Sequence, residues 1–206
     1  MLNKPVETFE AWTRILEGGH GIDVVFLDFR KAFDSVSHKK LIMILQAYGI
    51  DKKMINWIEN YLTGRSMAVR VNGKLSSWAT VLSGVPQGSV LGPLLFLLFV
   101  NELPAWIINS MMMFADDAKI WTKISSESDS NSLQEDLNEL IIWSQTWLLK
   151  FHPEKCKMMH IGHQINTTYN MTDSGKTVQL NPTREEKDLG VYIVDSLKPS
   201  LQCIKA

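Results

Sequence analysis

The fold of this chain is decided by one stretch of sequence, Phe114-Ala115-Asp116-Asp117-Ala118-Lys119. Apolar residues lead into it from Met111 and out of it to Trp121, which is typical of two strands joined by a short turn. Adjacent aspartates are unusual at a two-residue hairpin turn, because such turns favour Asn-Gly or Asp-Gly. Two neighbouring carboxylates repel each other unless a cation binds there, and Mg²⁺ prefers oxygen ligands of this kind. Taken alone, the pair predicts either a solvated turn or part of a metal site.

A further aspartate follows a second apolar stretch. Residues 22–27 are rich in β-branched and aromatic side chains and predict a buried strand, and Asp28 comes directly after them. If this strand and the acidic hairpin belong to one sheet, Asp28, Asp116 and Asp117 converge at its edge. Two-metal phosphoryl transfer needs such a set, because carboxylate oxygens must bridge two divalent ions about 3.5–4 Å apart. Three unrelated surface aspartates are the alternative, which explains poorly why each adjoins an apolar strand.

Composition narrows the class of protein. The 206 residues are 45% hydrophobic and 21% charged, which predicts a packed globular core. A formal net charge of −1 is weak evidence against a nucleic-acid-binding domain. The two cysteines, Cys156 and Cys203, form no disulfide framework, and the longest apolar run, 94–100, is far short of the ~20 residues that span a bilayer. We therefore expect a soluble intracellular protein, in the cytoplasm, the nucleus or both, that does not contact a membrane.

The first half of the chain predicts helices and one clear hairpin. Helical spacing marks residues 6–17, and two further helices begin at the caps Ser37 and Asp51, with Tyr48 and Met54 on their inner faces. Asn72-Gly73 predicts a type I′ turn within a hairpin over residues 67–81. After a tight loop at 83–89, residues 92–103 predict an apolar helix that is buried on most sides.

The second half continues the same mixture. Residues 125–131 predict a polar linker, followed by a long amphipathic helix that ends near Lys150. Residues 158–161 predict a strand, Ser174-Gly175 a hairpin tip, and 187–193 a last ordered segment. The order of these elements predicts an α+β fold, an antiparallel sheet backed by helices.

Five segments resemble, in order and at matching spacing, the palm motifs of reverse transcriptases. They are residues 25–34 (Val-Phe-Leu-Asp-Phe-Arg-Lys-Ala-Phe-Asp), 83–93 (Ser-Gly-Val-Pro-Gln-Gly-Ser-Val-Leu-Gly-Pro), 114–117 (Phe-Ala-Asp-Asp), 151–157 and 187–190. The third has the Phe-Ala-Asp-Asp form typical of non-LTR, LINE-type retrotransposons. The resemblance covers nearly the whole chain, and five motifs in sequence are specific where each alone would be modest.

The resemblance implies a polymerase palm with partial fingers, forming a single reverse transcriptase domain over residues 1–206. The N-terminal fingers, the thumb and an endonuclease are expected to be absent from this chain and to belong to the remainder of a retrotransposon polyprotein. The implied enzyme is an RNA-directed DNA polymerase, a nucleotidyltransferase that extends a DNA primer 3′-OH with dNTPs on an RNA template during retrotransposition. The alternative is a non-catalytic retrotransposon-derived fragment that only binds nucleic acid or a partner.

The resemblance also assigns roles by position. Asp28, Asp116 and Asp117 would hold two Mg²⁺ ions, or Mn²⁺, with the Phe29 carbonyl as a further ligand. The implied nucleotide-binding residues are Phe29, Arg30, Lys31, Ala32, Phe33, Gln87 and Gly88. Of these, the backbone amides around Lys31 and Ala32 would contact the triphosphate, and the Phe33 ring would lie under the sugar.

Lys155 is implied as the acid that protonates the leaving pyrophosphate, and the segment at Leu189-Gly190 as a support for the primer end. Taken singly, Phe33 also fits a core aromatic, and Lys155 a solvated side chain. We expect Asp34 and Asp188 to be structural.

Overall fold

The structure, a computed structural model, describes residues 4–162 and 165–198 and divides into two compact units. Unit 1 combines the described residues up to Phe29 with Leu103–Ser144 and those from Phe151 onward. Unit 2 combines Arg30–Glu102 with Gln145–Lys150.

Unit 1 is built on a five-stranded sheet with the strand order β11-β8-β1-β7-β6. The strands are β1 (Gly21–Leu27), β6 (Ser110–Phe114), β7 (Asp117–Ile124), β8 (Lys157–Ile161) and β11 (Asn181–Pro182). The central strand β1 pairs antiparallel with both β7 and β8, and β6 pairs antiparallel with β7. The predicted strand after residue 21 and the acidic hairpin therefore do belong to one sheet.

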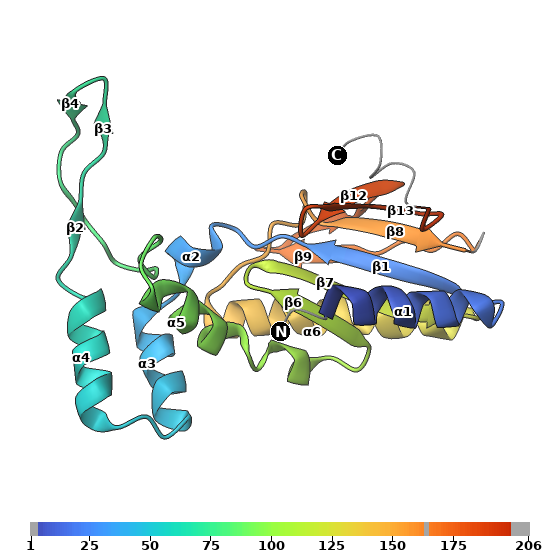
Figure 1. Ribbon diagram of the computed structural model, residues 1–206, viewed down its shortest axis with the longest axis horizontal. Helices are drawn as coiled ribbons and strands as arrows, with labels where there is room; N and C mark the ends of the chain where they lie inside the picture. The colour runs from blue at the N-terminus through green and yellow to red at the C-terminus, as the bar shows by residue number, and fades with distance from the viewer. Residues whose placement is uncertain (1–3, 163–164, 199–206) are drawn as a thin grey trace. The chain divides into compact units, whose positions relative to one another are not determined.

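Two helices and a hairpin cover this sheet. Helix α1 (Lys4–Glu17) packs Trp12 against Ile22, Val24 and Trp121 on one face, together with Ile193 of the hairpin β12 (Glu185–Asp188) and β13 (Val191–Val194). The opposite face is also buried, and α6 (Glu127–Trp147) runs behind it, on the other side of the sheet from α1 (Figure 1). A short hairpin, β9 (Asn170–Asp173) and β10 (Lys176–Gln179), and the 3-10 helix η1 (Leu103–Trp106) complete the unit.

Unit 2 consists of helices and one long two-stranded ribbon. The helices are α2 (Ala32–Ser35), α3 (His38–Ala47), α4 (Lys52–Leu62) and α5 (Leu91–Val100). The ribbon is formed by β2 (Ser66–Met67) with β5 (Ala79–Thr80) and by β3 (Arg70–Val71) with β4 (Lys74–Leu75). Both predicted caps are confirmed, because the side chains of Ser37 and Asp51 accept from the backbone N–H groups of Lys40 and Lys53.

The predicted linker over residues 125–131 is wrong, because α6 already begins at Glu127. The Asp129 carboxylate accepts from the backbone N–H groups of Ser125 and Ser126 at 2.8 and 2.9 Å, so local hydrogen bonds start the helix without an apolar stripe. The helix also ends earlier than predicted, at Trp147, where Leu148 takes a positive φ of 62°.

Some predicted inner faces are also wrong. Tyr48 and Met54 are 39% and 51% exposed, and Ile44 is buried on α3 instead. The Tyr48 hydroxyl donates to the Glu102 carboxylate at 2.6 Å, which explains why this end of the helix stays at the surface. On α5, Leu94 and Leu97 are 52% and 39% exposed, so the helix is less enclosed than its composition suggests. Within the described residues, no helix has the length and apolar character needed to cross a membrane.

Candidate active site

The acidic hairpin turns one residue earlier than its sequence suggests. Phe114 pairs with Asp117 across β6 and β7, so the two turn residues are Ala115 and Asp116. Ala115 takes the left-handed conformation, with φ of 54°. The turn therefore places Asp116 at its exposed tip, while Asp117 becomes the first residue of β7.

The strand register places Asp28 beside this turn. The last pair of the β1–β7 ladder joins Leu27 to Ala118. Asp28 and Asp117 are the next residues beyond this pair on the two chains, so both lie at the same end of the β1–β7 ladder. The predicted convergence of the three aspartates at the end of the sheet is thus supported by the pairing of the two strands that carry them.

The carboxylates at this end of the sheet act on one another. Partial burial raises the pKa of Asp117 above its ordinary value, and the negative charges of Asp116, Asp188 and Asp28 raise it further. The Lys119 ammonium partly offsets this effect. A cation bound among neighbouring carboxylates would offset their mutual repulsion and stabilise their charged forms. A divalent ion would do so most strongly.

Lys119 is the buried cation of this region. Its side chain is 3% exposed, forms an ion pair with Asp188 of β12, and lies 5.7 Å from the centre of the Trp12 ring. The ion pair joins the β12–β13 hairpin to β7 two residues after Asp117. Asp188 therefore has the structural role expected of it, and it also adds to the negative charge around Asp117.

The backbone of Asp28 is held by the turn that precedes β8. The His152 N–H donates to the Asp28 carbonyl at 2.8 Å, and the Asp28 N–H donates to the Cys156 sulfur at 3.4 Å. Burial raises the pKa of the Cys156 thiol to about 11, so it remains a neutral acceptor. The Phe29 ring stacks on Phe151 with ring centres 4.6 Å apart. These contacts fix the direction in which the chain leaves β1.

Lys155 belongs to the same turn. Its backbone N–H donates to the His152 carbonyl at 2.8 Å, while its side chain is exposed. The turn thus links Lys155 to the segment that holds Asp28, and the role of its ammonium group stays a prediction.

The remaining predicted residues belong to unit 2. Lys31 takes a positive φ of 49° and precedes the short helix α2, which carries Ala32 and Phe33. The Phe33 ring stacks on Phe96 of α5 with centres 4.6 Å apart. Arg30 is exposed, and its backbone N–H donates to the Lys150 carbonyl at 2.8 Å.

The loop that carries Gln87 and Gly88 is bonded to the segment that carries Phe33. Val85 N–H donates to the Phe33 carbonyl at 2.7 Å, and Gly84 N–H donates to the Val36 carbonyl at 2.8 Å. Gly84 has φ of 91°, and a Cβ there would lie 2.7 Å from the Asp34 Cα, so only glycine fits. Gln87 and Gly88 themselves are exposed. Unit 2 thus brings the end of the first motif, from Arg30 onward, beside the second motif.

Predicted site residues are shared between the units. Unit 1 holds Asp28, Phe29, Asp116, Asp117 and Lys155, and unit 2 holds Arg30, Lys31, Ala32, Phe33, Gln87 and Gly88. Over residues 4–162 and 165–198, no three His, Cys, Asp or Glu side chains are arranged closely enough to hold a metal ion as they stand. The donor types nevertheless fit a hard divalent cation, and Asp116 and Asp117 are exposed, so their rotamers can change at little cost.

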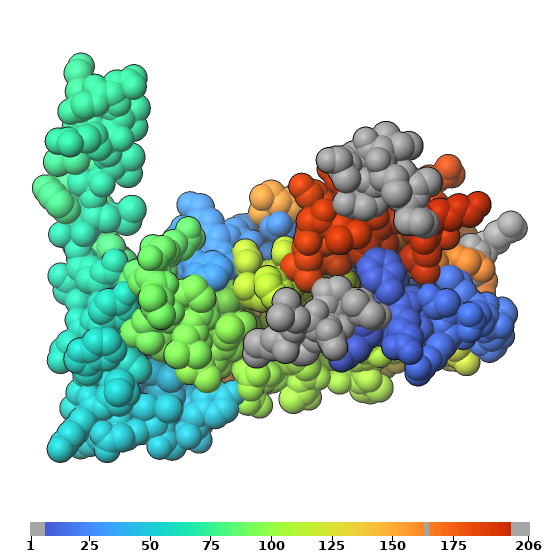
Figure 2. Space-filling model, in the orientation of Figure 1, coloured from blue at the N-terminus to red at the C-terminus, as the bar shows by residue number. Residues whose placement is uncertain are grey.

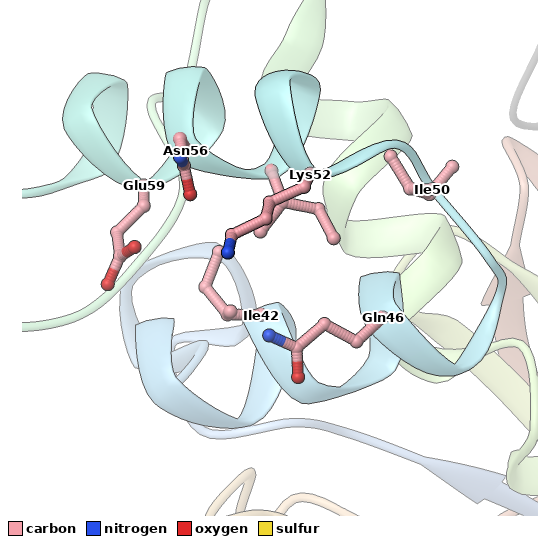
Figure 3. Close-up of a pocket in the computed structure, with 7 residues that line it drawn as sticks. Ile42, Gln46, Ile50, Lys52, Asn56 and Glu59 are labelled. Carbon is pink, nitrogen blue, oxygen red and sulfur yellow. The ribbon is translucent and has the colours of Figure 1, made fainter.

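A cavity of about 280 Å³ lies between α3 and α4 of unit 2 (Figure 3). Its labelled lining includes Gln46, Lys52 and Glu59, which point toward the space between the two helices. None of the residues predicted from the motifs lines it.

Three residues that position the site received no role from sequence alone. They are Lys119, Cys156 and Gly84, which act through the ion pair, the hydrogen bond and the close backbone approach described above. Each lies inside a segment that resembles a motif or directly beside one. Their position in or near the motifs was therefore the only sequence feature that could have identified these three residues, because their residue types do not indicate a specific partner.

The paired strands, the acidic end of the sheet and the covering helices define an α+β fold of the polymerase kind. The chain belongs to the reverse transcriptase (RNA-dependent DNA polymerase) family, whose model matches residues 14–193. The family predicted from the five motifs is confirmed.

Curated relatives come from non-LTR elements of insects. The RNA-directed DNA polymerase from mobile element jockey of Drosophila funebris is 30% identical over 181 residues, which cover 84% of this chain and 19% of that protein. The Pol polyprotein from the type-1 retrotransposable element R2 of Popillia japonica is 31% identical over 152 residues, 67% of this chain and 24% of that protein. The chain thus spans only about a fifth of the length of these relatives.

A solved structure of apo telomerase from Candida tropicalis superimposes with a TM-score of 0.59. The match covers 93% of this chain and 39% of that one, at 15% sequence identity. At this identity the likeness shows the fold alone, and it confirms the predicted α+β fold.

Proposed function

We propose that this chain supplies the catalytic core of an RNA-directed DNA polymerase, which extends a DNA primer 3′-OH with dNTPs on an RNA template. The observation that carries the proposal is the pairing of β1 and β7, whose last pair, Leu27 with Ala118, has Asp28 and Asp117 one residue beyond it and Asp116 in the adjoining turn. Membership of the reverse transcriptase family supports the same reaction. The rest of a retrotransposon polyprotein is the expected partner, and the reaction would take place inside the cell, in the cytoplasm or the nucleus.

Asp28, Asp116 and Asp117 would hold two Mg²⁺ ions, or Mn²⁺, with the Phe29 carbonyl as a further ligand. Bound metal would lower the pKa of the primer hydroxyl and neutralise charge on the leaving pyrophosphate. The raised pKa of Asp117 supports this proposal, because it reflects repulsion by the Asp116 and Asp28 carboxylates. A bound cation would relieve that repulsion. The stacked Phe29 and Phe151 rings and the hydrogen bonds to Asp28 would keep this end of β1 rigid.

In unit 2, Phe33 would lie under the sugar of the incoming nucleotide and reject a 2′-hydroxyl by its bulk. Its stacking on Phe96 supports this role, because a ring held on one side cannot move away from a substituent. Backbone amides around Lys31 and Ala32 would contact the triphosphate, with Arg30 nearby in sequence. Gln87 and Gly88 would contact the nucleotide and template.

In unit 1, Lys155 would donate a proton to the leaving pyrophosphate. With the palm and part of the fingers, residues 1–206 would form a single reverse transcriptase domain.

Metal binding is the first test. Manganese titration of the full chain, followed by electron paramagnetic resonance of the free ion, should reveal bound Mn²⁺ that is lost in Asp116→Ala and Asp28→Ala. Glu135→Ala, an exposed acid on α6, is the matched control and should bind as the parent does. Unchanged Mn²⁺ affinity in Asp116→Ala would overturn the proposed site.

Primer extension on poly(rA)·oligo(dT) tests the activity itself. Extension that Asp28→Asn abolishes supports catalysis by this chain. Binding of the primer–template without any Asp28-dependent extension supports the alternative, a non-catalytic fragment that only binds nucleic acid or a partner.

A further inference from the structure

Helix α4 carries a stacked row of side chains on an exposed face. Trp57 is 55% exposed, and its ring lies parallel to that of Tyr61, with centres 5.8 Å apart and an angle of 9° between the planes. The Arg65 guanidinium lies 5.9 Å from the centre of the Tyr61 ring. Trp57 and Tyr61 are four residues apart and share one face of α4, and Arg65, which follows the end of the helix, continues the row through its contact with Tyr61. We call these three residues the aromatic row.

A hollow opens beside the free end of this row. It has a volume of about 440 Å³ and is lined by Asp51, Lys53, Met54 and Trp57. The Asp51 carboxylate is engaged as the helix cap, accepting from the Lys53 N–H at 2.8 Å. Met54 is 51% exposed, so the wall next to Trp57 is apolar and open to solvent. A planar, partly apolar group that stacked on Trp57 would be received in this hollow.

The chain beyond the row is positively charged. Between Glu59 and Glu102 the sequence contains no acidic residue, whereas it contains Arg65, Arg70 and Lys74. All residues from Val71 to Thr80 are exposed, and the ribbon rises from the end of α4, clear of α3 and α5 (Figure 1). In the space-filling view the ribbon is a narrow arm (Figure 2). Arg70 and Lys74, the cations of the ribbon, are therefore exposed to solvent.

From these observations we propose that the aromatic row and the adjoining ribbon bind single-stranded nucleic acid. Bases would stack on Trp57, and phosphates would contact Arg65, Arg70 and Lys74. Stacking platforms beside cations are the common way in which unpaired strands are held, because every base offers a flat face and every nucleotide a negative charge. A duplex hides its base faces and is a poor ligand for such a row.

Only an acidic protein partner would neutralise the positive charge of Arg65, Arg70 and Lys74, whereas any nucleic acid would do so. The inference therefore favours nucleic acid over protein. It rests on the proposed function for the identity of the strand, which would be the unpaired RNA template.

Fluorescence anisotropy of the full chain with a labelled 12-nucleotide RNA tests the stacking. We expect Trp57→Leu to weaken binding at least about fivefold, since base–aromatic stacking is worth about 1–3 kcal/mol. Trp57→Phe keeps a flat ring and should retain most of the affinity. Equal affinity of the parent, the Leu and the Phe variants would overturn the proposal, as would equal loss in Leu and Phe. Trp57 is exposed, so circular dichroism should show all three folded.

Salt dependence tests the binding of phosphates by the three cations. The triple variant Arg65→Gln, Arg70→Gln, Lys74→Gln should lower the slope of log affinity against log salt by about 0.7 for each phosphate that is no longer neutralised. Lys39→Gln, an exposed cation on α3, is the matched control and should leave the slope unchanged. Equal slopes for the triple variant and the parent would contradict the proposal. If a single-stranded DNA of the same length binds with equal affinity, the proposed ligand includes both single-stranded RNA and single-stranded DNA. If an RNA duplex competes as well as the single strand does, the stacking model is overturned.

The measurement is made in EDTA, which separates it from the metal site. Asp28→Asn should bind the labelled RNA as the parent does, although it would abolish primer extension. Loss of RNA binding in Trp57→Leu with Mn²⁺ binding intact therefore supports the row alone. Loss of Mn²⁺ binding in Asp116→Ala with RNA binding intact supports the metal site alone.

Discussion

Two regions of the sheet in unit 1 treat an aspartate in opposite ways. Asp23, in the middle of β1, is fully buried and lies 2.5 Å from His160 Nδ1, while Thr167 and Tyr169 donate to it at 2.5 and 2.6 Å. Burial by itself raises the pKa of Asp23, but the hydrogen bonds from His160, Thr167 and Tyr169 together outweigh burial and lower it. The surroundings of Asp23 thus stabilise its charge.

At the end of the same sheet the balance is reversed. Asp117 is exposed at the start of β7, yet partial burial and the charges of Asp116, Asp188 and Asp28 raise its pKa. The buried carboxylate is matched by donors and serves the fold, whereas the exposed one is surrounded by like charge. Perturbed carboxylates of the second kind gather at functional sites, because a ligand supplies the compensation that the protein does not. The difference marks this end of the sheet as the candidate site without reference to the family.

Removing the matched carboxylate should have the largest effect. Asp23→Ala takes away the acceptor of two buried hydroxyls, on Thr167 and Tyr169, and we expect it to lower the free energy of unfolding by about 3–5 kcal/mol. Urea denaturation followed by circular dichroism measures this change. Glu139→Ala, an exposed acid on α6, is the control and should stay within about 0.5 kcal/mol of the parent. A loss for Asp23→Ala as small as that of the control would show that the two regions do not differ.

Breaking the ion pair at the acidic end should have a smaller effect. Lys119→Met leaves Asp188, which is 12% exposed, without its cation, and we expect a loss of about 2–3 kcal/mol. The double variant Lys119→Met, Asp188→Leu should lose less than the single one, because an apolar pair of similar volume replaces buried charges. Urea denaturation of both variants gives the comparison. A double variant that is less stable than Lys119→Met would contradict this account.

Removing the crowded carboxylate should have the smallest effect, and of opposite sign. With its pKa raised above the ordinary 3.8, Asp117 in the folded chain holds more protons than in the unfolded chain over the interval above that value. The free energy of unfolding therefore falls as the pH rises through the raised pKa. Asp117→Asn removes this loss, so at pH 7 it should stabilise the chain, by at most about 0.5 kcal/mol because solvent screens the exposed site.

Stability measured from pH 3.5 to 8 should accordingly decline less for Asp117→Asn than for the parent. Asp23→Asn is the matched comparison and should destabilise the chain at pH 7, because the pKa of Asp23 is lowered and its charged form is the stabilised one. Destabilisation by Asp117→Asn at pH 7 would remove the contrast between the two regions.

Much of the local structure could be read from particular residues. The β-branched run before Asp28 predicted the central strand, Asn72-Gly73 predicted its hairpin, and Ser37 and Asp51 predicted two caps. The turn at Ala115 and Asp116 could not be read, because an alanine with positive φ carries no sequence signal. The start of α6 was missed because hydrogen bonds to Asp129, rather than apolar spacing, begin that helix.

The sequence indicated the acidic residues of the candidate site but not the residues that hold them in place. Sequence order and spacing brought out Asp28, Asp116 and Asp117, since each adjoins an apolar strand. Cys156, which accepts from the Asp28 N–H, is 128 residues away from it in sequence, and no local pattern links the two. The loop at Gly84 meets the Phe33 segment only because the backbone of unit 2 folds them together.

The sequence by itself determined which elements form and which family the chain belongs to, because hydrophobic period, turn residues and ordered motifs are local properties. Only the tertiary structure decided which aspartate is matched and which is crowded. Lys119 and Asp188 are 69 residues apart in sequence, and His160 lies 137 residues from Asp23. Coulomb energy and desolvation depend on distances in space and on burial, and those exist only once the strands have paired.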